Sequence, residues 1–354
     1  MMDFIKISGY KSIKEVNLKL TPVNVLIGAN GTGKSNFISF FEFLNKLCDQ
    51  KLAEYVGTKG GEDRILHKGP KITTELSFEL SFNNGQNGYS ASLQKGTDGF
   101  KVKAEYLIYK GDRGRNISTF GSEAYLMRSD NFRAKYVIRF LNSFRKFHFH
   151  DTGKNSPFAR MSQMDNDKYF LYEDGQNLAA FLYSIREENK IVYNRIIKNI
   201  QSIAPFFSDF FLQPNNEGFM RLQWLDKFSS NVYGANDLSD GTARFIALTT
   251  LFMQPVLPAT IIIDEPELGL HPFAINKLAG MINSAAERGA QVIIATQSAD
   301  LVNHFSAGQI ITVGQEEGES YFNRLKEDEL SQWLEEYGVG DLWQRNIIPG
   351  GQPQ

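Results

Sequence analysis

The feature that most constrains the fold is a glycine-rich segment near the N-terminus. Residues 28–35 read Gly-Ala-Asn-Gly-Thr-Gly-Lys-Ser and match the pattern G-x-x-x-x-G-K-[ST] at every fixed position. An apolar run, residues 23–27, precedes the segment, and a run typical of a helix, residues 36–44, follows it. This strand–loop–helix context predicts a loop whose backbone N–H groups surround phosphate oxygens at the start of a helix.

Each fixed position of this loop has a physical reason. Gly28, Gly31 and Gly33 let the backbone approach an anion closely. Lys34 is expected to pair with the β- and γ-phosphates, and Ser35 to hold Mg²⁺ where the positive end of the helix dipole faces the anion. The alternative, a chance glycine-rich turn, is disfavoured by the flanking strand and helix patterns. The residues expected to contact the nucleotide here are Asn30, Gly31, Thr32, Gly33, Lys34, Ser35 and Asn36.

Composition sets limits on partners and location. The 354 residues are 42% apolar, enough for a sizeable core, and the net charge of −2 gives no global electrostatic case for nucleic acid or a membrane. The single cysteine, Cys48, excludes a disulfide framework and fits a reducing compartment. Residues 245–263 are apolar but broken by Gln254, Pro255 and Pro258. With no signal-peptide pattern at the start, we expect a cytoplasmic protein without a membrane span.

The apolar periodicity changes along the chain. Residues 4–20, 72–82, 89–93 and 100–109 alternate apolar and polar side chains, which predicts an antiparallel sheet, with a loop over 57–70. Helices are expected at 131–145 and 177–203, a strand at 147–150 and a hairpin within 210–228. From residue 239, helices at 243–253 and 272–288 alternate with strands at 260–263, 291–295 and 309–313. That alternation predicts a parallel sheet, and residues 348–354 are expected to be disordered.

Two acidic residues follow an apolar run in the second half of the chain. Residues 261–263 are three isoleucines, typical of a buried parallel strand, and Asp264 and Glu265 come directly after them. Ligands bind at the carboxyl ends of strands in open α/β sheets. Asp264 suits Mg²⁺ binding through water, and Glu265 suits the base that orients a water for attack on a γ-phosphate. Without a phosphate loop elsewhere, a surface turn would explain the pair equally well.

A third segment, residues 238–244, reads Leu-Ser-Asp-Gly-Thr-Ala-Arg and opens an apolar helix. Ser239 is suited to cap this helix, and Gly241 permits close approach of an anion. Taken alone the segment is only a helix start. Its position before Asp264 favours a functional interpretation.

These segments occur in the order found in ABC-type ATPases. The chain is similar to the RecF/SMC/overcoming-lysogenization branch of soluble ABC ATPases, and within it to the AAA_21-type group that carries Asp-Glu-Pro-Glu-Leu-Gly-Leu-His-Pro, here residues 264–272. The start of the chain, residues 7–13, resembles that of the branch, and Leu-Ser-Asp-Gly-Thr replaces the Leu-Ser-Gly-Gly-Gln of transporter subunits. An importer or exporter subunit is therefore disfavoured. Residues 50–235 carry little specific sequence.

The resemblance implies an α/β fold of the P-loop NTPase type, an ABC-type head with a mixed N-terminal sheet lobe and a helical insertion and signature lobe. The boundaries expected are 1–175 for the ATP-binding lobe, 176–235 for the insertion and hairpin, 236–347 for the signature lobe and 348–354 for a tail. Two heads would form a homodimer around two shared ATP molecules with Mg²⁺, and a higher oligomer is left open. Ser239, Asp240 and Gly241 of one head would touch the γ-phosphate held by the other, and Lys11 and Ser12 would lie near the base or ribose.

The sequence departs from the family pattern at two positions. Gln297 stands where the family has a histidine that contacts the γ-phosphate, and glutamine cannot carry a proton. Hydrolysis is therefore expected to be retained but slow. The glutamine that senses Mg²⁺ at the lobe junction has no certain counterpart. Gln176 is the candidate, and the alternative is an ordinary polar helix start.

The resemblance implies an ATP-hydrolysing, ATP-gated dimer acting in DNA repair or anti-phage defence, with a separately encoded nuclease or toxin as effector. The alternative is a scaffold that binds ATP, hydrolyses it rarely and sequesters a toxic partner. Residues 128–150 contain six basic residues against Asp130, with aromatic residues between them. That pattern fits contact with DNA or an acidic partner. The aromatic stripe is more simply explained as the core face of a helix, with the basic residues on its solvent face. His148 and His150 could share a strand face as metal ligands, although no partner set converges on them.

Overall fold

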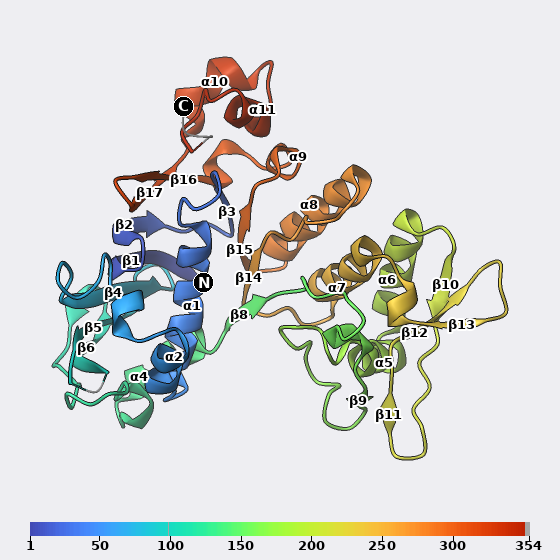
Figure 1. Cartoon of the computed structure of the whole chain (residues 1–354), viewed down its shortest axis with the longest axis horizontal. Coiled ribbons are helices and arrows are strands. Elements are labelled where there is room, and N and C mark those ends of the chain that lie inside the picture. The colour runs from blue at the N-terminus through green and yellow to red at the C-terminus, as the bar shows by residue number, and fades with distance from the viewer. Residues whose placement is uncertain (98, 351–354) are drawn as a thin grey trace. The chain divides into compact units, whose positions relative to one another are not determined.

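The computed structural model describes residues 1–97 and 99–350, and the chain divides into two compact units (Figure 1). Unit 1 consists of Met1–Arg145, Ala259–Ile262 and Gln291–Gln354, and unit 2 of Lys146–Pro258 and Ile263–Ala290. The units do not follow the boundaries expected at 175 and 235, because unit 1 takes its residues from three separate stretches of the chain.

The first sheet of unit 1 is antiparallel and has the strand order β2-β1-β4-β5-β6-β7. Its strands are β1 (Met2–Tyr10), β2 (Ile13–Lys19), β4 (Glu75–Phe82), β5 (Asn87–Lys95), β6 (Phe100–Tyr109) and β7 (Asp112–Arg113). Leu76, Phe78 and Leu80 of β4 are buried while the polar residues between them are half-buried, as period-two alternation predicts. The predicted antiparallel sheet is thereby confirmed.

The second sheet has the order β17-β16-β3-β15-β14-β8. Its strands are β3 (Val23–Ile27), β8 (Phe144–Phe147), β14 (Thr260–Asp264), β15 (Gln291–Thr296), β16 (Ile310–Glu316) and β17 (Glu319–Arg324). β3 pairs in parallel with β15 and with β16, and every residue of β3 and β15 is buried. The parallel sheet predicted from the alternation of helices and strands is confirmed. The antiparallel edge strand β17 was not predicted.

Helix α1 (Lys34–Cys48) packs between the two sheets of unit 1 (Figure 1). Its buried residues form a broad apolar face, and the opposite face carries Ser35, Ser39, Glu42 and Lys46. Phe40 lies at the centre of this packing, with its ring centroid 5.2 Å from Tyr10, 5.6 Å from Phe43 and 5.6 Å from Phe78. Burial also raises the pKa of the Cys48 thiol to about 12. The helix that carries the glycine-rich loop is therefore fixed along its whole length.

The remaining helices of unit 1 correct several predictions. They are α2 (Leu52–Thr58), α3 (Glu62–Ile65), α4 (Phe132–Leu141), α9 (Ala299–Val302), α10 (Glu327–Leu334) and α11 (Val339–Gln344). The predicted loop at 57–70 contains α3 and the end of α2. The predicted helix at 131–145 ends at Leu141, because Phe144 starts β8. Phe132 and Tyr136 are 66% and 55% exposed, so the core-face interpretation of the aromatic stripe is wrong for these two residues.

The end of the described chain lies against the glycine-rich loop. Ile348 is buried, and the backbone N–H of Ala29 donates a hydrogen bond to the carbonyl of Gly350 over 3.0 Å. The expectation of disorder is therefore wrong for residues 348–350. Residues 351–354 lie outside the described residues.

Unit 2 is mainly helical, with α5 (Leu178–Glu188), α6 (Lys190–Ile203), α7 (Asp240–Met253) and α8 (Pro272–Glu287). The helix predicted over 177–203 is two helices, because Asn189 leaves the helical conformation and caps α6 by accepting the N–H of Val192. Small strands complete the unit: β10 (Phe207–Phe210), β12 (Gln223–Asp226) and β13 (Val232–Gly234) form one sheet, and β9 (Ser162–Gln163) pairs with β11 (Phe219–Met220). The strand predicted at 147–150 is displaced, since β8 ends at Phe147. Across the described ranges, no helix is both long enough and apolar enough to cross a membrane.

The core position of Phe40 gives a first prediction. Phe40→Ala removes a ring that packs on three others, and large-to-small substitutions of this kind lower the free energy of unfolding by about 3–5 kcal/mol. Urea unfolding followed by circular dichroism measures the change. Phe228→Ala, at a side chain that is 85% exposed, is the matched control and is expected to change stability by less than about 0.5 kcal/mol. Equal effects of the two variants would contradict the packing described for α1.

Candidate functional site

The glycine-rich loop of unit 1 has the conformation of an anion cradle. It leaves the buried strand β3 at Ile27 and enters α1 at Lys34, and Gly31 and Gly33 adopt positive φ angles of 81° and 111°. Gly33 is the N-cap of α1 and provides no side-chain cap for the first backbone N–H groups. Those N–H groups and the helix dipole therefore favour an anionic ligand.

Lys34 lies over this loop. Its side chain is only 4% exposed, and its Nζ donates hydrogen bonds to the carbonyl oxygens of Gly28 and Ala29 over 2.7 and 2.9 Å. Thr32 Oγ1 donates to the same Ala29 carbonyl over 3.0 Å. A buried ammonium group next to the uncapped helix start places positive charge where a phosphate chain would enter the cradle.

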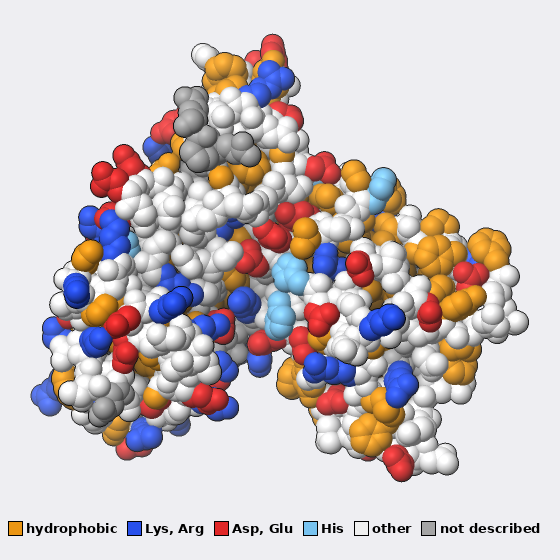
Figure 2. All heavy atoms as spheres, viewed as in Figure 1, with side chains coloured by type: hydrophobic (Ala, Val, Ile, Leu, Met, Phe, Trp, Pro, Cys, Tyr) orange, Lys and Arg blue, Asp and Glu red, His pale blue; other side chains and the backbone are white. Residues whose placement is uncertain are grey.

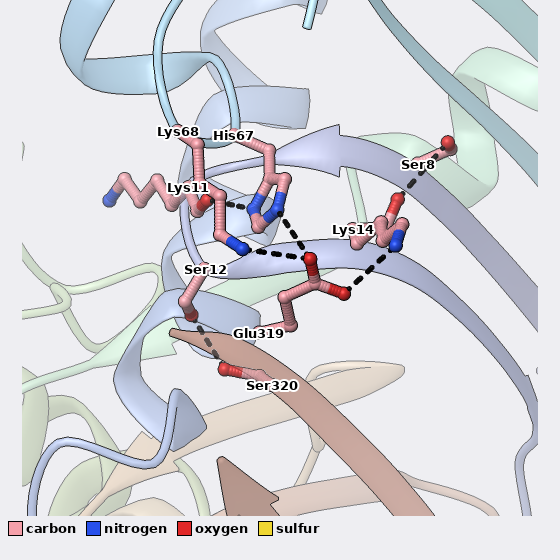
Figure 3. A network of polar contacts seen from close by, with 8 residues as sticks. All are labelled: Ser8, Lys11, Ser12, Lys14, His67, Lys68, Glu319 and Ser320. Carbon is pink, nitrogen blue, oxygen red and sulfur yellow. Dashed lines mark hydrogen bonds and ion pairs between the residues drawn. The ribbon is translucent and has the colours of Figure 1, made fainter. Parts of the chain in front are cut away.

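Two serines from different sheets pack on the back of the loop. Ser320 Oγ of β17 lies 2.6 Å from the carbonyl oxygen of Thr32 and 2.7 Å from Ser12 Oγ, in the turn between β1 and β2 (Figure 3). The N–H of Ser320 also donates to the carbonyl of Ser12 over 2.8 Å. A Cβ atom at Gly33 would collide with both hydroxyl groups. Only glycine therefore fits at position 33, on steric as well as conformational grounds.

Lys11 and Ser12 were expected near a base or ribose. In the structure their side chains form hydrogen bonds with residues of α1. Lys11 has a φ of 49°, which is held by hydrogen bonds of its backbone to Ile65 and His67. Its Nζ donates to Ser39 Oγ of α1 over 2.8 Å. Ser12 Oγ accepts a hydrogen bond from Asn36 over 2.7 Å. The structure thus places both residues beside the first two turns of α1.

A charged network extends from this turn to the surface (Figure 3). Glu319, next to Ser320, pairs with Lys68 at 2.8 Å and with Lys14 at 3.1 Å. His67 is buried, with Nδ1 2.8 Å from the Lys11 carbonyl and Nε2 3.8 Å from Glu319 Oε1. The hydrogen bond from Lys68, followed by that from Lys14, lowers the pKa of Glu319 to about 2. Salt bridges therefore reinforce the contact between β17 and the turn behind the loop.

Gln297 directly follows β15, at the same end of the sheet at which the glycine-rich loop leaves β3. Thr296, the last residue of β15, is paired with Ile27, the last residue of β3, and the two strands are parallel. Gln297 is half-buried, and Ser298 caps α9 by accepting the N–H of Leu301. Within unit 1 the predicted γ-phosphate contact thus lies next to the strand that leads into the cradle.

The acidic pair stands at the end of β14. Asp264 is the last residue of the strand and Glu265 follows it, and both side chains are half-buried. Glu265 has a φ of 45°, in the left-handed region that residues with a Cβ avoid. Such strain persists where the surrounding structure holds it, and it is frequent at functional sites.

In unit 2, α7 starts at the segment that resembles the ABC signature. Ser239 is the N-cap, and its Oγ accepts the N–H of Thr242. Ser239 and Asp240 are exposed, while a Cβ at Gly241 would collide with the carbonyl oxygen of Gly269. The signature turn and the loop after Glu265 therefore approach each other at backbone distance within this unit.

Arg244, in the first turn of α7, connects this helix to the segment after β8. It is buried, its Nε donates to the carbonyl of Phe149 over 3.0 Å, and one terminal nitrogen donates to that of His150 over 3.2 Å. Burial lowers the pKa of Arg244, which Asp240 and Glu267 partly offset. Arg244 thus ties the first turn of α7 to the segment that follows β8.

The other predicted ligands are placed as follows. Gln176 precedes α5, and its Oε1 accepts a hydrogen bond from Arg160 over 3.1 Å. His148 and His150 are exposed. Among residues 1–97 and 99–350, no group of three or more His, Cys, Asp or Glu side chains could hold a metal ion.

Sequence reasoning missed Ser320, Arg244 and Gly269 as parts of the site. Ser320 was missed because β17 was not predicted, and its partners are more than 280 positions away. The other two lie within the quoted motifs, but spacing alone did not show that an arginine and a glycine would meet across them.

Comparison with known proteins identifies relatives over most of the chain. Residues 23–303 match the AAA_21 family, described as "AAA domain, putative AbiEii toxin, Type IV TA system". The chain is 35% identical over 353 residues to "Old nuclease" of Escherichia phage P2, and the match covers 87% of this chain and 58% of that protein. The chain thus spans less than two thirds of the length of this relative.

Solved structures of SMC heads share the fold. An SMC head bound to the C-terminal winged-helix domain of ScpA has a TM-score of 0.60 at 15% identity, covering 94% of this chain and 99% of that chain. An Smc head with an extended coiled coil bound to the C-terminal domain of ScpA, derived from Pyrococcus furiosus, has a TM-score of 0.58 at 16% identity, covering 95% and 98%. At these identities the likeness shows the fold, and together with the family match it confirms the expected P-loop NTPase fold of the ABC-head type.

The network around Glu319 predicts a pH dependence of stability. Because folding lowers the pKa of Glu319 from 4.5 to about 2, its stabilising effect is complete above pH 4.5 and is lost as the pH falls towards 2. The difference in unfolding free energy between wild type and Glu319→Gln is therefore expected to shrink over this range in urea titrations. Glu54→Gln removes an exposed carboxylate and controls for the charge change. A difference that stays constant between pH 6 and pH 3 would contradict the network.

Proposed function

The chain belongs to the AAA_21 family, within the overcoming-lysogenization/RecF/SMC-like ABC ATPases, and from this we propose that it binds and hydrolyses ATP as an ATP-gated homodimer. We propose that the dimer acts in DNA repair or anti-phage defence and controls a separately encoded nuclease or toxin. The observation that carries the proposal is the glycine-rich loop of unit 1. Three of its features favour an anion there: the positive φ angles of Gly31 and Gly33, the uncapped start of α1, and the buried ammonium group of Lys34. That combination is suited to a triphosphate.

We propose Mg²⁺ as the ion that accompanies ATP, with Ser35 and Asp264 among its ligands. Ser35 in the first turn of α1 and Asp264 at the end of β14 supply oxygen atoms, the ligands that Mg²⁺ prefers. When bound, Mg²⁺ would neutralise charge on the phosphates. Since Mg²⁺ keeps several waters and phosphate ligands, it needs no cluster of protein carboxylates. Gln176 remains our candidate for the amide that senses the ion.

The chemical step is assigned to Glu265 and Gln297. Glu265 orients the attacking water and accepts its proton, and the left-handed backbone at this residue supports a special placement of its carboxylate. Gln297 donates a hydrogen bond to the γ-phosphate from the end of the strand beside β3. Because an amide cannot relay a proton, we expect slow turnover.

The second half of each ATP site is assigned to another copy of the chain. Ser239, Asp240 and Gly241 form the exposed start of α7, where backbone N–H groups and the helix dipole are suited to a γ-phosphate. Contact between this start and the loop of a second protomer gives a symmetric dimer with two shared sites. ATP would hold the dimer closed, and hydrolysis would release it.

The proposed partners follow from the relatives and from the surface. The family description names a toxin and one relative is named a nuclease, which supports an effector of either kind. Unit 2 exposes apolar side chains suited to a protein partner, and hydrophobic atoms gather over β10, β12 and β13 in Figure 2. DNA is the proposed second partner, and a cytoplasmic location fits the single buried cysteine.

A scaffold that hydrolyses ATP rarely and sequesters a toxic partner is the second candidate function, and Gln297 is the observation that favours it. Steady-state ATP hydrolysis with and without DNA separates the two candidates. Stimulation by DNA supports the ATP-gated machine. A turnover that is negligible under both conditions, with tight ATP binding, supports the scaffold.

Removal of the loop lysine tests ATP binding. Lys34→Ala deletes a charge-assisted hydrogen-bond donor to the phosphates, so ATP affinity is expected to fall about 10- to 100-fold. Binding of a fluorescent ATP analogue measures the change, with a circular dichroism spectrum to establish folding. Lys46→Ala, in the last turn of α1, is the matched control. Unchanged affinity in a folded Lys34→Ala protein would refute the assignment of the loop.

Removal of the proposed base tests hydrolysis separately from binding. Glu265→Gln retains size and polarity but loses the proton acceptor, so turnover is expected to fall about 10²- to 10⁴-fold while ATP binding is retained. Phosphate release under single-turnover conditions is the measurement. Glu287→Gln, on the exposed end of α8, serves as control. If Glu265→Gln hydrolyses ATP at the wild-type rate, the catalytic assignment is wrong.

A further inference from the structure

Unit 1 contains a second cavity, away from the glycine-rich loop. It has a volume of about 1030 Å³ and is bounded by the turn between β4 and β5, the end of β6, and α4. Its residues all belong to unit 1, from Met1–Arg145 and Ala259–Ile262. The volume is that of a small-molecule binding site, and no role assigned above uses this cavity.

Aromatic rings form much of its wall. Phe132 and Tyr136 of α4 and Tyr109 of β6 line the cavity and are exposed. Phe140, one turn further along α4, is stacked on Phe82 with the centroids 4.7 Å apart and the planes within 5°. Large exposed rings on one helix face, next to a fixed stacked pair, form a platform for flat ligands.

The polar lining is positive and amide-rich. Arg133 lies 4.8 Å from the centroid of the Tyr109 ring and 5.9 Å from that of Phe132, so its charge stays at the cavity while it contacts the rings. Arg139, also in the lining, makes no ion pair with any described residue. Asn87 and Asn142 present side-chain amides that make no hydrogen bond to the described part of the chain. No aspartate or glutamate is part of the described lining.

We propose that this cavity binds the unpaired nucleotides of a single-stranded nucleic acid. Bases would stack on Tyr136 and Phe132, Arg133 and Arg139 would pair with backbone phosphates, and the amides would hydrogen-bond base edges. The proposal rests on the proposed function, which names DNA as a partner. It adds where the nucleic acid binds and that the bound part is single-stranded. It does not depend on ATP hydrolysis.

Two features favour a single-stranded nucleic acid over a duplex or a free mononucleotide. The faces of bases within a duplex are covered by their neighbours, so the exposed rings suit unpaired bases. Positive charge also continues beyond the cavity, where Lys110 lies 5.6 Å from the Tyr109 ring centroid and Lys135 is exposed on α4. A chain of phosphates uses this extension, whereas a free mononucleotide does not.

The test measures binding of a fluorescent oligothymidylate of about 15 nucleotides by anisotropy, at several salt concentrations and without ATP. Tyr136→Ala is expected to weaken binding about tenfold, and Tyr136→Trp to restore it because stacking is retained. Arg139→Gln is expected to weaken binding and to reduce its salt dependence. Tyr169→Ala, at an exposed tyrosine of unit 2, and Lys51→Gln, at an exposed lysine outside the cavity, are the matched controls.

The competing outcomes are distinct. Competition by thymidine monophosphate as strong as by the oligonucleotide would make this a mononucleotide site and overturn the proposal. Equal affinity for a duplex of the same length, equal effects of the control variants, or no binding by the wild type would overturn it as well. ATP binding is measured on the same preparations. Normal ATP binding without oligonucleotide binding refutes this inference alone, and the reverse refutes the proposed ATPase alone.

Discussion

The contact of Ser12 and Ser320 with Gly33 is the constraint on which unit 1 depends. It joins the antiparallel sheet, through the turn after β1, to the parallel sheet, through β17, directly behind the phosphate loop. Because a Cβ at position 33 would separate these elements, the same glycine that shapes the anion cradle also allows the two sheets to meet. The pairing of Glu319 with Lys14 and Lys68 holds this junction from outside. The loop is thus positioned by both sheets and by α1.

In unit 2, the start of α7 also contains a glycine that leaves no space for a side chain. Gly241 lets the start of α7 approach the backbone at Gly269, and Arg244 fixes that turn to the carbonyls of residues 149 and 150. In both units a glycine without space for a side chain connects a candidate phosphate-binding element to its surroundings. A nucleotide that touches either element can therefore affect residues remote from its phosphates, as an ATP-dependent switch requires.

Local patterns predicted those parts of the molecule that local forces determine. The glycine-rich loop, the alternation of β4 and the isoleucine run of β14 carry their structure in adjacent residues, and they were found. The break at Asn189 was missed because the apolar spacing continues across it, whereas the break depends on one residue that leaves the helical conformation and caps α6. Phe132 and Tyr136 were misplaced because the spacing of four gives a shared face but not the surface it meets. Ser320 acts through contacts distant in sequence, which no local pattern shows.

The central claim is that each ATP site is shared between two copies of the chain, with Lys34 from one and Ser239 from the other. Mixing Lys34→Ala protein with Ser239→Arg protein tests it most directly, since each variant alone has two defective sites per dimer. A mixed dimer has one intact site, so ATPase activity is expected to rise from near zero to about one quarter of the wild-type value. A mixture as inactive as its two components would contradict the shared site.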